Sequence, residues 1–272
     1  MASDFSYDPV TAIDEAGASG RTAAIFADIR QTMGIPLVTS IWRGLAGMGE
    51  SLSQVWELAK PIYASGLPVQ ALARVVARAD LPRPEPLVPA QLACAGVGER
   101  DVEDIRAILA AYNRSNGMNL VALAALVTPA APGESVNALP PAALAWPPLR
   151  PLLAREAIDA HTWTLIRHVN AFGASGIDAG VATLWRHLAH WPGLLAVIHA
   201  AFVPLQSRDA ITAASARVVA LAVKEGSHMA RLRPAEFEIS RQARDTITGY
   251  VNEPAQVARM VTIGHALADW MK

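Results

Sequence analysis

The sequence predicts an all-α protein in which two tandem helical repeats pack against each other as an intramolecular pseudo-dimer. Three observations support this prediction. The composition is 52% hydrophobic but only 6% aromatic, with alanine and leucine dominant, which favours helices over strands. Apolar residues recur at helical spacing in several segments, and alternating patterns typical of strands are almost absent. Four sequence blocks also recur in the same order in the two halves of the chain.

The first half begins with three predicted helices, over residues 23–33, 37–48 and 51–63. Apolar residues in these segments return every three or four positions, so that one face of each helix is apolar. The sequence Gly34-Ile35-Pro36 separates the first two helices, because glycine and proline interrupt helical segments. Pro61 lies late in the third segment, and we expect it to kink or end that helix.

The second half repeats this series. Residues 183–205 align without a gap with residues 40–62, and residues 240–250 align with residues 102–112. The aligned pairs include Trp42 with Trp185, Arg43 with Arg186, and Tyr112 with Tyr250. Identity is low, but the order of the blocks is kept, and we therefore predict one internal duplication.

A segment rich in proline and alanine, residues 130–151, lacks helical periodicity and is the predicted linker between the copies. We assign residues 1–136 to the first repeat, with the N-terminal tail and the start of the linker, and residues 137–272 to the rest of the linker and the second repeat. Two copies joined in this way usually pack about a pseudo-two-fold axis. The chain is therefore expected to form one compact unit.

The charge and the cysteine content exclude several classes of partner and site. Lysine plus arginine number 23 against 24 acids, so there is no electrostatic reason to expect a nucleic acid or a membrane as partner. The single cysteine, Cys94, excludes an intramolecular disulfide and Cys-x-x-Cys motifs. The N-terminus lacks the pattern of a signal peptide, and the longest apolar run, residues 120–127, is too short for a membrane span. We expect a cytoplasmic protein.

Two histidines, His187 and His190, stand three residues apart in the stretch TLWRHLAHWPGLL and allow two interpretations. Their rings could share one helix face and bind a metal, but no further ligands stand at the spacing of a known metal motif. The first repeat has Gly44 and Gly47 at the aligned positions. We therefore favour partly buried histidines that bond to backbone groups, and we expect neither a metal nor a cofactor.

The aligned arginines Arg43 and Arg186 also allow two interpretations. They lie inside apolar helices, and we favour a structural role in which they pair with an acid or a helix C-terminus across the pseudo-two-fold axis. The alternative is that one of them binds a substrate carboxylate, for which a guanidinium group is well shaped.

The polar stretch YNRSNGMN, residues 112–119, follows an amphipathic helix and precedes an apolar run. One interpretation is a helix terminus, with Asn113 and Asn116 satisfying free backbone groups. The other is a cluster of amide donors that face a pocket between the copies. The sequence does not decide between them.

Together these features resemble the group I haloacid dehalogenases, the family that cleaves both enantiomers of 2-haloalkanoic acids. Three segments carry the resemblance: IFADIRQTMGIPLVTSIWRGLA (25–46), IRAILAAYNRSNGMNLVALAAL (105–126) and TLWRHLAHWP (183–192). The resemblance implies an all-helical pseudo-dimer with the active site between its repeats. It also implies a mechanism in which an aspartate activates a water that displaces halide directly from the α-carbon.

The resemblance transfers to individual residues only in part. Asn113 matches the active-site asparagine of the family, and Tyr250 matches its late tyrosine. Thr183 stands at the serine that precedes the catalytic aspartate. The remaining matches are apolar or small residues of the substrate pocket: Leu37 at a tryptophan, Ser40 at a phenylalanine and Leu184 at the catalytic aspartate itself.

Leu184 cannot accept a proton, and the loss of a general base typically lowers a rate roughly 10²–10⁴-fold. The nearest acid is Asp178, in the glycine-flanked loop GASGIDAG, and it could swing into the pocket as the base or stand exposed in a turn. We therefore carry the fold over from the family, while dehalogenation through the usual aspartate is not expected.

Three hypotheses for the function follow. The first is a cofactor-independent hydrolase or related enzyme that acts on a small carboxylate-bearing molecule, with Asn113, Tyr250 and Asp178 as catalytic residues. The second is a non-catalytic protein that binds an apolar ligand in the same pocket, which Leu37 and Leu184 make more apolar than that of the family. The third is an interaction role through an oligomer interface, with a homodimer as the simplest case.

Overall fold

The computed structural model describes residues 12–132, 144–234 and 238–272 of the chain. These residues form α-helices and short 3-10 or π segments, with no strand among the described residues, which confirms the predicted all-α class. The α-helices are α1 (Gly20–Met33), α2 (Ser40–Ala46), α3 (Ser51–Ala64), α4 (Leu67–Arg78), α5 (Pro89–Cys94), α6 (Glu99–Val127), α7 (Ala160–Asn170), α8 (Thr183–His187), α9 (Pro192–Ser207), α10 (Ala210–Met229), α11 (Arg241–Asn252) and α12 (Arg259–Trp270). The short segments are η1 (Arg155–Ala157), η2 (Leu188–His190), η3 (Ala230–Leu232) and η4 (Pro254–Ala258).

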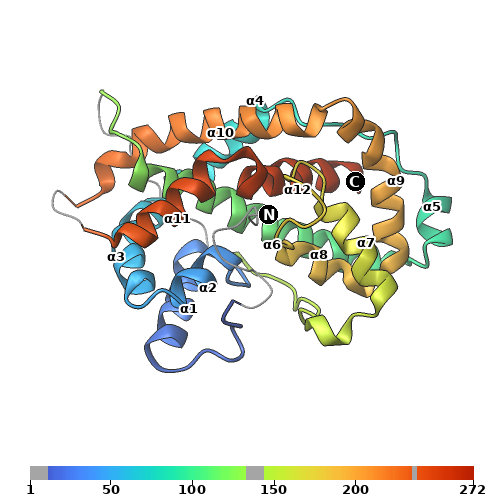
Figure 1. Cartoon of the computed structure of the whole chain (residues 1–272), viewed down its shortest axis with the longest axis horizontal. Helices are drawn as coiled ribbons and strands as arrows, with labels where there is room; N and C mark the ends of the chain where they lie inside the picture. Colours follow the sequence, from blue (N-terminus) through green and yellow to red (C-terminus); the bar gives the residue numbers. More distant parts are fainter. Residues whose placement is uncertain (1–11, 133–143, 235–237) are drawn as a thin grey trace.

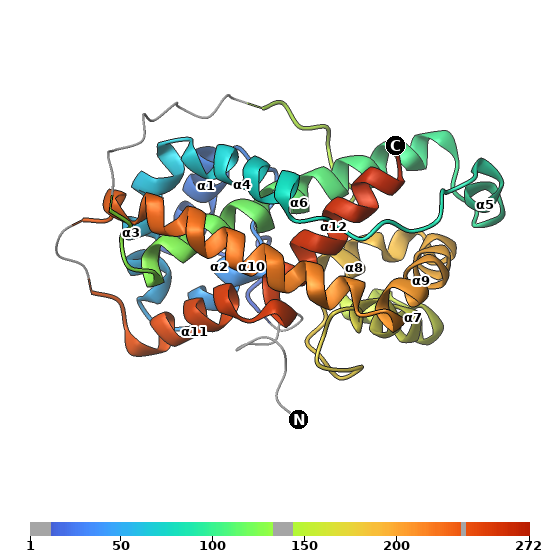
Figure 2. The same cartoon turned by 90° about the horizontal axis from the view of Figure 1, so that it is seen from above.

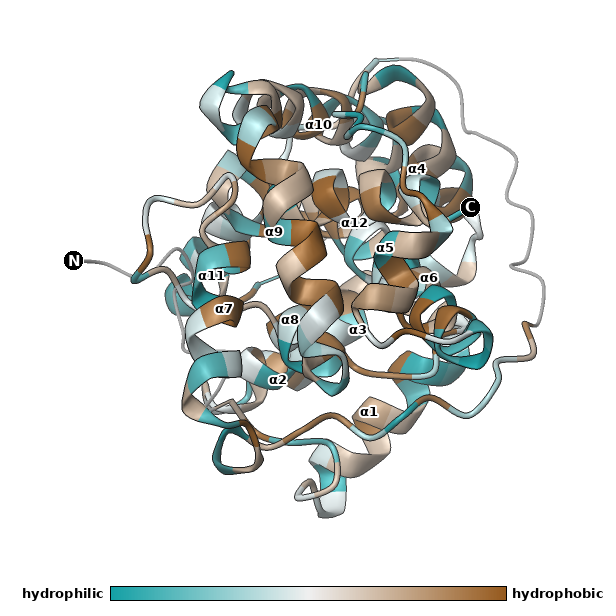
Figure 3. Ribbon diagram, turned by 90° about the vertical axis from the view of Figure 1, so that its right-hand side faces the viewer, coloured by the Kyte–Doolittle hydropathy of each residue, from teal (hydrophilic) through white to brown (hydrophobic). Residues whose placement is uncertain are grey.

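The helices α6, α10 and α12 form the centre of the molecule and pack against one another. Figure 1 shows α10 along one long side, with α6 and α12 beneath it. Helices α1, α2 and α3 lie towards one end of this centre and α7, α8 and α9 towards the other, as Figure 2 also shows from above. Most helices carry both hydrophobic and hydrophilic residues (Figure 3), as helices around an apolar core require.

Helix α6 belongs to two hydrophobic cores. Its first part, which includes Ile105, Ile108 and Tyr112, packs in one core with α7, α8, α9 and α12. Its second part, from Met118 to Leu126, packs in the other core with α1 to α4, α10 and α11. Each core therefore takes residues from both halves of the sequence, and the two halves interlock rather than fold side by side.

The polar stretch at residues 112–119 lies inside α6, so the interpretation of it as a helix terminus is wrong. Asn113 and Asn119 are buried, and their side chains bond to other elements instead of capping α6. Gly117 lets α4 approach closely, because a Cβ at this position would lie 2.3 Å from a methyl carbon of Leu72. Packing thus overrides the low helix propensity of asparagine and glycine.

The segment of the second half that aligns with α6 is broken. Here α11 ends at Asn252, η4 follows, and α12 begins at Arg259. Pro254 lacks the backbone N–H that would continue the helix, and Gln256 leaves helical geometry, with φ −88° and ψ −132°.

The three helices predicted in the first half are present as α1, α2 and α3. Gly34 ends α1 in the left-handed conformation, with φ +59°, which is the role expected of a glycine there. Helix α2 is shorter than predicted and begins at Ser40, while α3 continues past Pro61 to Ala64.

The predicted repeat boundary, between residues 136 and 137, and residues 133–143 of the predicted linker lie outside the described residues. Within the described part of the chain, no single helix meets the length and hydropathy expected of a membrane span. One pair of helices, α9 and α10 with η3, meets them only when taken together, and the pair is bent by 79°.

Candidate functional site

A small cavity, called the inner cavity below, lies where α2, α6, α8 and α11 meet. It is lined by residues from both halves of the chain: Thr39, Ser40, Tyr112, Asn116, Ala182, Thr183, Leu184, Tyr250, Val257 and Met260. Its open volume is ≈ 20 Å³, about the space that one ordered water needs. Six of these ten described residues carry a hydroxyl or amide group, and none of the ten carries a carboxylate.

Residues that align in the predicted duplication meet across this cavity. Ser40 begins α2 and Thr183 begins α8, and both line it. Tyr112 and Tyr250, the aligned tyrosines, line it as well. The pseudo-two-fold arrangement of the two copies stays a prediction.

The hydroxyl group of Thr183 is the most informative polar group of the cavity. Thr183 is 6% exposed, and its Oγ1 atom has no hydrogen-bond partner among the described residues. Buried hydroxyl groups are nearly always hydrogen-bonded to protein or water. The position therefore fits a bound water or a ligand atom inside the cavity.

Four of the residues predicted from the sequence, namely Ser40, Thr183, Leu184 and Tyr250, line the inner cavity together. Two others do not. Leu37 is half-buried and packs against the core that contains α8 and α9. Asn113 is turned towards α12, where its Nδ2 donates to the carbonyl oxygen of Gly264 at 2.9 Å.

Asp178 is not among the lining residues. Its side chain is 53% exposed, and its carboxylate forms an ion pair with Arg167 of α7. A carboxylate held in this way is turned to solvent and to its partner, so no acid of the described residues lines the inner cavity.

The structure adds Tyr112 and Asn116 to the site, which the sequence indicated only as a repeat mate and as one member of an amide cluster. Tyr112 is buried, and burial raises the pKa of its phenol. Its hydroxyl lies 3.3 Å from Nδ1 of His187. Because Nε2 of His187 faces the carbonyl oxygen of Arg150, Nε2 carries the proton and Nδ1 accepts from Tyr112.

Burial also lowers the pKa of His187 below its ordinary value, so the imidazole is neutral near pH 7. His190 bonds through Nε2 to the carbonyl oxygen of Pro151. Both histidines thus bond to backbone carbonyls, as the favoured interpretation of the sequence expects. Within the described ranges no three His, Cys, Asp or Glu residues gather as a metal site.

A second cavity, called the outer cavity below, has a volume of ≈ 450 Å³ and lies against α2, α8 and the segment around η1. It is lined by Ala12, Asp14, Arg43, Leu152, Ala154, Arg155, Glu156 and Arg186. Arg43 and Arg186 are the aligned arginines, and both are buried. Arg43 stands three residues after Ser40, and Arg186 stands three residues after Thr183. Each arginine therefore lies on the same helix face as the hydroxyl residue of the inner cavity that precedes it.

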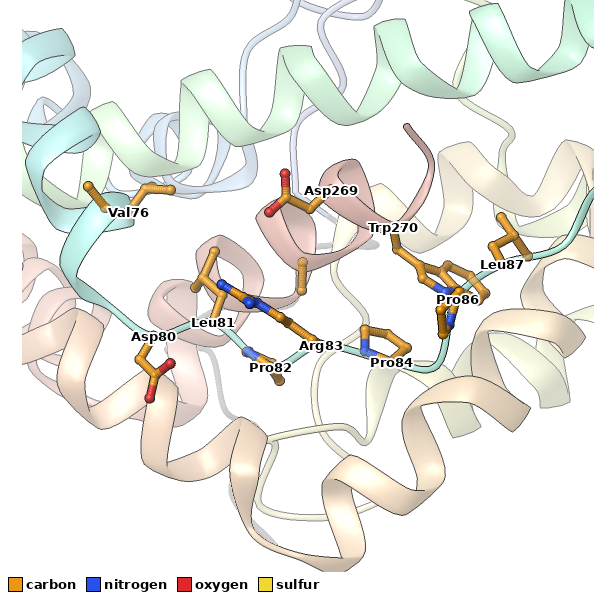
Figure 4. Close-up of a pocket in the computed structure, with 12 residues that line it drawn as sticks. Val76, Asp80, Leu81, Pro82, Arg83, Pro84, Pro86, Leu87, Asp269 and Trp270 are labelled. Carbon is orange, nitrogen blue, oxygen red and sulfur yellow. The ribbon is translucent and has the colours of Figure 1, made fainter.

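A larger cavity, of ≈ 630 Å³, lies elsewhere, along the proline-rich segment 80–87 and the end of α12 (Figure 4). Trp270 holds this segment by donating from Nε1 to the carbonyl oxygen of Glu85 at 2.7 Å. This cavity shares no lining residue with the inner or the outer cavity. Size alone therefore does not mark the functional site.

No family model matches the sequence, and no curated protein matches it. The fold, by contrast, is similar to solved structures of D-2-haloacid dehalogenase. A mutant in complex with D-2-CPA has a TM-score of 0.76, a second mutant structure 0.77, and a complex with L-LA 0.72. Each is 14% identical, and the alignments cover 97% of this chain and 96% of the other. At this identity the comparison establishes the fold, which is that of the D-2-haloacid dehalogenases.

Proposed function

We propose that the protein binds a small carboxylate-bearing molecule between its two halves, and that it does not hydrolyse 2-haloacids with a carboxylate-activated water. Structures with the same fold hold small carboxylates, which supports the first part of the proposal. The described lining residues of the inner cavity, none of which is a carboxylate, support the second part.

The observation that carries the proposal is the buried hydroxyl of Thr183. A buried polar group without a partner costs about 1–3 kcal/mol. A ligand or water that bonds to Thr183 beside Ser40 and Tyr250 removes this cost. In the proposal these three residues and Leu184 contact the ligand, while Leu37 supports the apolar wall and Asn113 fixes α6 against α12.

The inner cavity must widen to admit more than a water. Leu184 and Met260 are its largest aliphatic side chains, and methionine adapts readily to a change in shape. We therefore expect the reorganisation on binding to be confined to these side chains.

The lack of a carboxylate among the described lining residues limits the chemistry. A general base contributes roughly 10²–10⁴-fold to a rate, and Asp178 is engaged with Arg167. We propose accordingly that Asp178 is a surface residue of the loop and has no part in the site.

The test combines two measurements on the same sample. Isothermal titration calorimetry with lactate and both enantiomers of 2-chloropropionate should detect binding, and Thr183→Val should weaken it roughly tenfold or more. Chloride release from 2-chloropropionate should stay at the rate of a protein-free control. Chloride release above that rate by the folded wild type would contradict the proposal, as would binding that Thr183→Val leaves unchanged.

A second candidate, an enzyme that uses a different proton acceptor, is favoured by the contact between Tyr112 and His187. Neutral His187 could take the hydroxyl proton of Tyr112 while Tyr112 takes one from a group in the inner cavity. A turnover screen with small carboxylic esters and hydroxy acids tests it. Turnover by the wild type that is lost in both Tyr112→Phe and His187→Gln would favour this candidate over simple binding.

A further inference from the structure

We infer that the cavity along residues 80–87 is a second ligand-binding site, and that its ligand is a free α-amino acid with an aromatic side chain. This site is separate from the one in the proposed function, because the two cavities share no lining residue. Three features of the cavity carry the inference: its volume, the rigid apolar groups at one end and the charged groups at the other.

The cavity is large enough for a whole small molecule. Its volume of ≈ 630 Å³ lies within the range of typical small-molecule sites, about 300–1,000 Å³. The end of α4, the segment 80–87 and the end of α12 all contribute lining residues, and every one of these residues lies in the described part of the chain (Figure 4). An amino acid therefore has room there without a rearrangement of the fold.

An aromatic ring and two prolines form a rigid apolar end. Trp270 donates from Nε1 to the carbonyl oxygen of Glu85 at 2.7 Å, and its ring packs edge-on against Phe202 of α9, with 6.2 Å between the ring centroids. Pro84 and Pro86 stand beside it in the lining, and the proline ring fixes φ. Groups held in this way lose little entropy when a ligand binds, and an indole ring packs well against another aromatic ring.

The charged side chains of the lining lie towards the other end of the cavity. Figure 4 shows Asp80, Arg83 and Asp269 displaced from Trp270 and Pro86 in the direction of α4. A lining with charges of both signs at one end and apolar groups at the other complements a ligand that carries an ammonium group, a carboxylate and a ring.

Arg83 is the group that binds the carboxylate of the ligand. It is exposed, and Figure 4 shows its side chain extended along the cavity towards Leu81. Arg83 forms no ion pair with another described residue. Because a guanidinium group offers two parallel N–H donors to a carboxylate, the position suits an α-carboxylate.

Asp80 and Asp269 are the groups that bind the ammonium group. Oδ2 of Asp80 pairs with Arg217 at 3.3 Å, and Oδ1 of Asp269 pairs with Lys272. The other oxygen of each carboxylate has no hydrogen-bond partner among the described residues. An ionised carboxylate has about four acceptor sites, so both acids can accept from a ligand without losing their own pairs.

The backbone of Asp80 supports a functional assignment. Its φ is +53°, in the left-handed region that residues other than glycine seldom adopt. This conformation turns the chain from the end of α4 into the segment 80–87 and sets the carboxylate at the cavity. Residues held in such conformations are concentrated at ligand-binding and active sites.

The charges favour a zwitterion over a simple acid or a simple amine. One arginine and two acids leave the lining with a net negative charge, so an aromatic acid without an ammonium group would be repelled by the two acids. An aromatic amine without a carboxylate would leave Arg83 unpaired. An amino acid satisfies both kinds of group at once.

The test is calorimetric titration of the wild type with L-phenylalanine and three analogues that each lack one feature. Phenylpropanoate lacks the ammonium group, phenethylamine lacks the carboxylate, and L-alanine lacks the ring. Each should bind roughly tenfold or more weakly than L-phenylalanine. An analogue that binds as tightly as L-phenylalanine would overturn the assignment, as would no binding of L-phenylalanine up to its solubility limit.

Variants of the exposed charged residues test the role of each group. Arg83→Gln should weaken L-phenylalanine roughly tenfold or more and abolish the preference over phenethylamine. The double variant Asp80→Asn, Asp269→Asn should abolish the preference over phenylpropanoate, and asparagine tolerates the left-handed conformation of position 80. Arg100→Gln, at an exposed arginine of α6 outside the lining, is the matched control and should bind like the wild type. Unchanged preferences in the variants would contradict the assigned roles.

The failure of this inference and the failure of the proposed function are distinguishable. If lactate binding depends on Thr183 while L-phenylalanine does not bind, the proposed function stands and the second site is wrong. If L-phenylalanine binding depends on Arg83 while lactate does not bind, the second site stands and the proposed function is wrong. Thr183→Val should leave L-phenylalanine binding unchanged, and a loss in this variant would show that the two sites are not separate.

Discussion

Helices α2 and α8 occupy aligned positions in the two halves of the chain but differ in how their polar groups are satisfied. Each begins with a hydroxyl residue of the inner cavity and buries a tryptophan completely. Trp42 of α2 donates from Nε1 to Oδ1 of Asn119 at 3.1 Å. Nε1 of Trp185 in α8 has no hydrogen-bond partner among the described residues.

This difference extends to the surroundings of each helix. Asn119 also accepts from the hydroxyl of Tyr63 at 2.9 Å and donates to Oγ1 of Thr39 at 2.7 Å, so a closed polar network surrounds α2. On the α8 side, Thr183 and Trp185 both leave a buried group without a partner in the described part of the chain. Unsatisfied groups of this kind concentrate at functional sites. In the proposed function, α2 is accordingly the structural side of the junction and α8 the ligand-binding side.

The largest effect expected from this comparison is a gain of dehalogenase activity when an acid is introduced on the α8 side, but not on the α2 side. Leu184→Asp places a carboxylate at the inner cavity, and chloride release from 2-chloropropionate should rise roughly 10²–10⁴-fold above the wild type. Ile41→Asp is the matched control, because Ile41 is the aligned residue of α2, is equally buried and does not line the cavity. A folded Leu184→Asp protein without chloride release would show that more than the acid is missing.

The next effect is on stability and concerns the α2 side. Asn119→Leu removes the partner of Trp42, Tyr63 and Thr39 at once, and the free energy of unfolding should fall by about 2–4 kcal/mol. Urea denaturation measures this change. Trp185→Phe, which removes an indole N–H without a partner, should cost much less, and an equal loss in both variants would remove the distinction between the two sides.

A smaller difference in the free energy of unfolding is expected between variants of two threonines that line the inner cavity, Thr39 and Thr183. Thr39→Val loses bonds to Asn119 and Ser115 and should lower the free energy of unfolding by about 1–2 kcal/mol. Thr183→Val loses no bond to a described residue, and the unfolding free energy of the ligand-free protein should stay the same or rise by up to ~1 kcal/mol. The reverse order would mean that the Thr183 hydroxyl is satisfied within the protein.

The smallest effect is the pH dependence that His187 contributes. Its folded pKa lies below its ordinary value of 6.5, mainly because burial disfavours the charged ring. The unfolded state therefore binds more protons as the pH falls below 6.5, and the stability that His187 contributes above that pH is lost. His187→Gln should flatten the fall of the unfolding free energy between pH 6.5 and 5. An unchanged slope would contradict this assignment.

The sequence predicted the parts of the fold that depend on local patterns. Apolar periodicity predicted α1 and α3, and the glycine at position 34 predicted the end of α1. The sequence did not predict that α6 runs through residues 112–119. Asn113 and Asn119 form hydrogen bonds with Gly264 and Trp42, which are far away in the sequence. Local propensity contains no information on such bonds.

The sequence likewise predicted some residues of the candidate site but not the contacts between their side chains. The alignment of the two halves and the family resemblance identified Ser40, Thr183, Leu184 and Tyr250, which the structure brings together. They did not reveal that Asp178 pairs with Arg167, or that Tyr112 contacts His187, since both depend on side-chain orientation. The outer cavity depends on how the segment after residue 149 packs on α8, and no local pattern encodes that.

The central claim, that the α8 side of the junction binds a small carboxylic acid, is tested most directly by a crystal structure with lactate bound. We expect ligand density in the inner cavity, with an oxygen atom of the ligand within hydrogen-bond distance of Oγ1 of Thr183. Density confined to the cavity along residues 80–87, or no density at a ligand concentration well above the Kd, would contradict the claim.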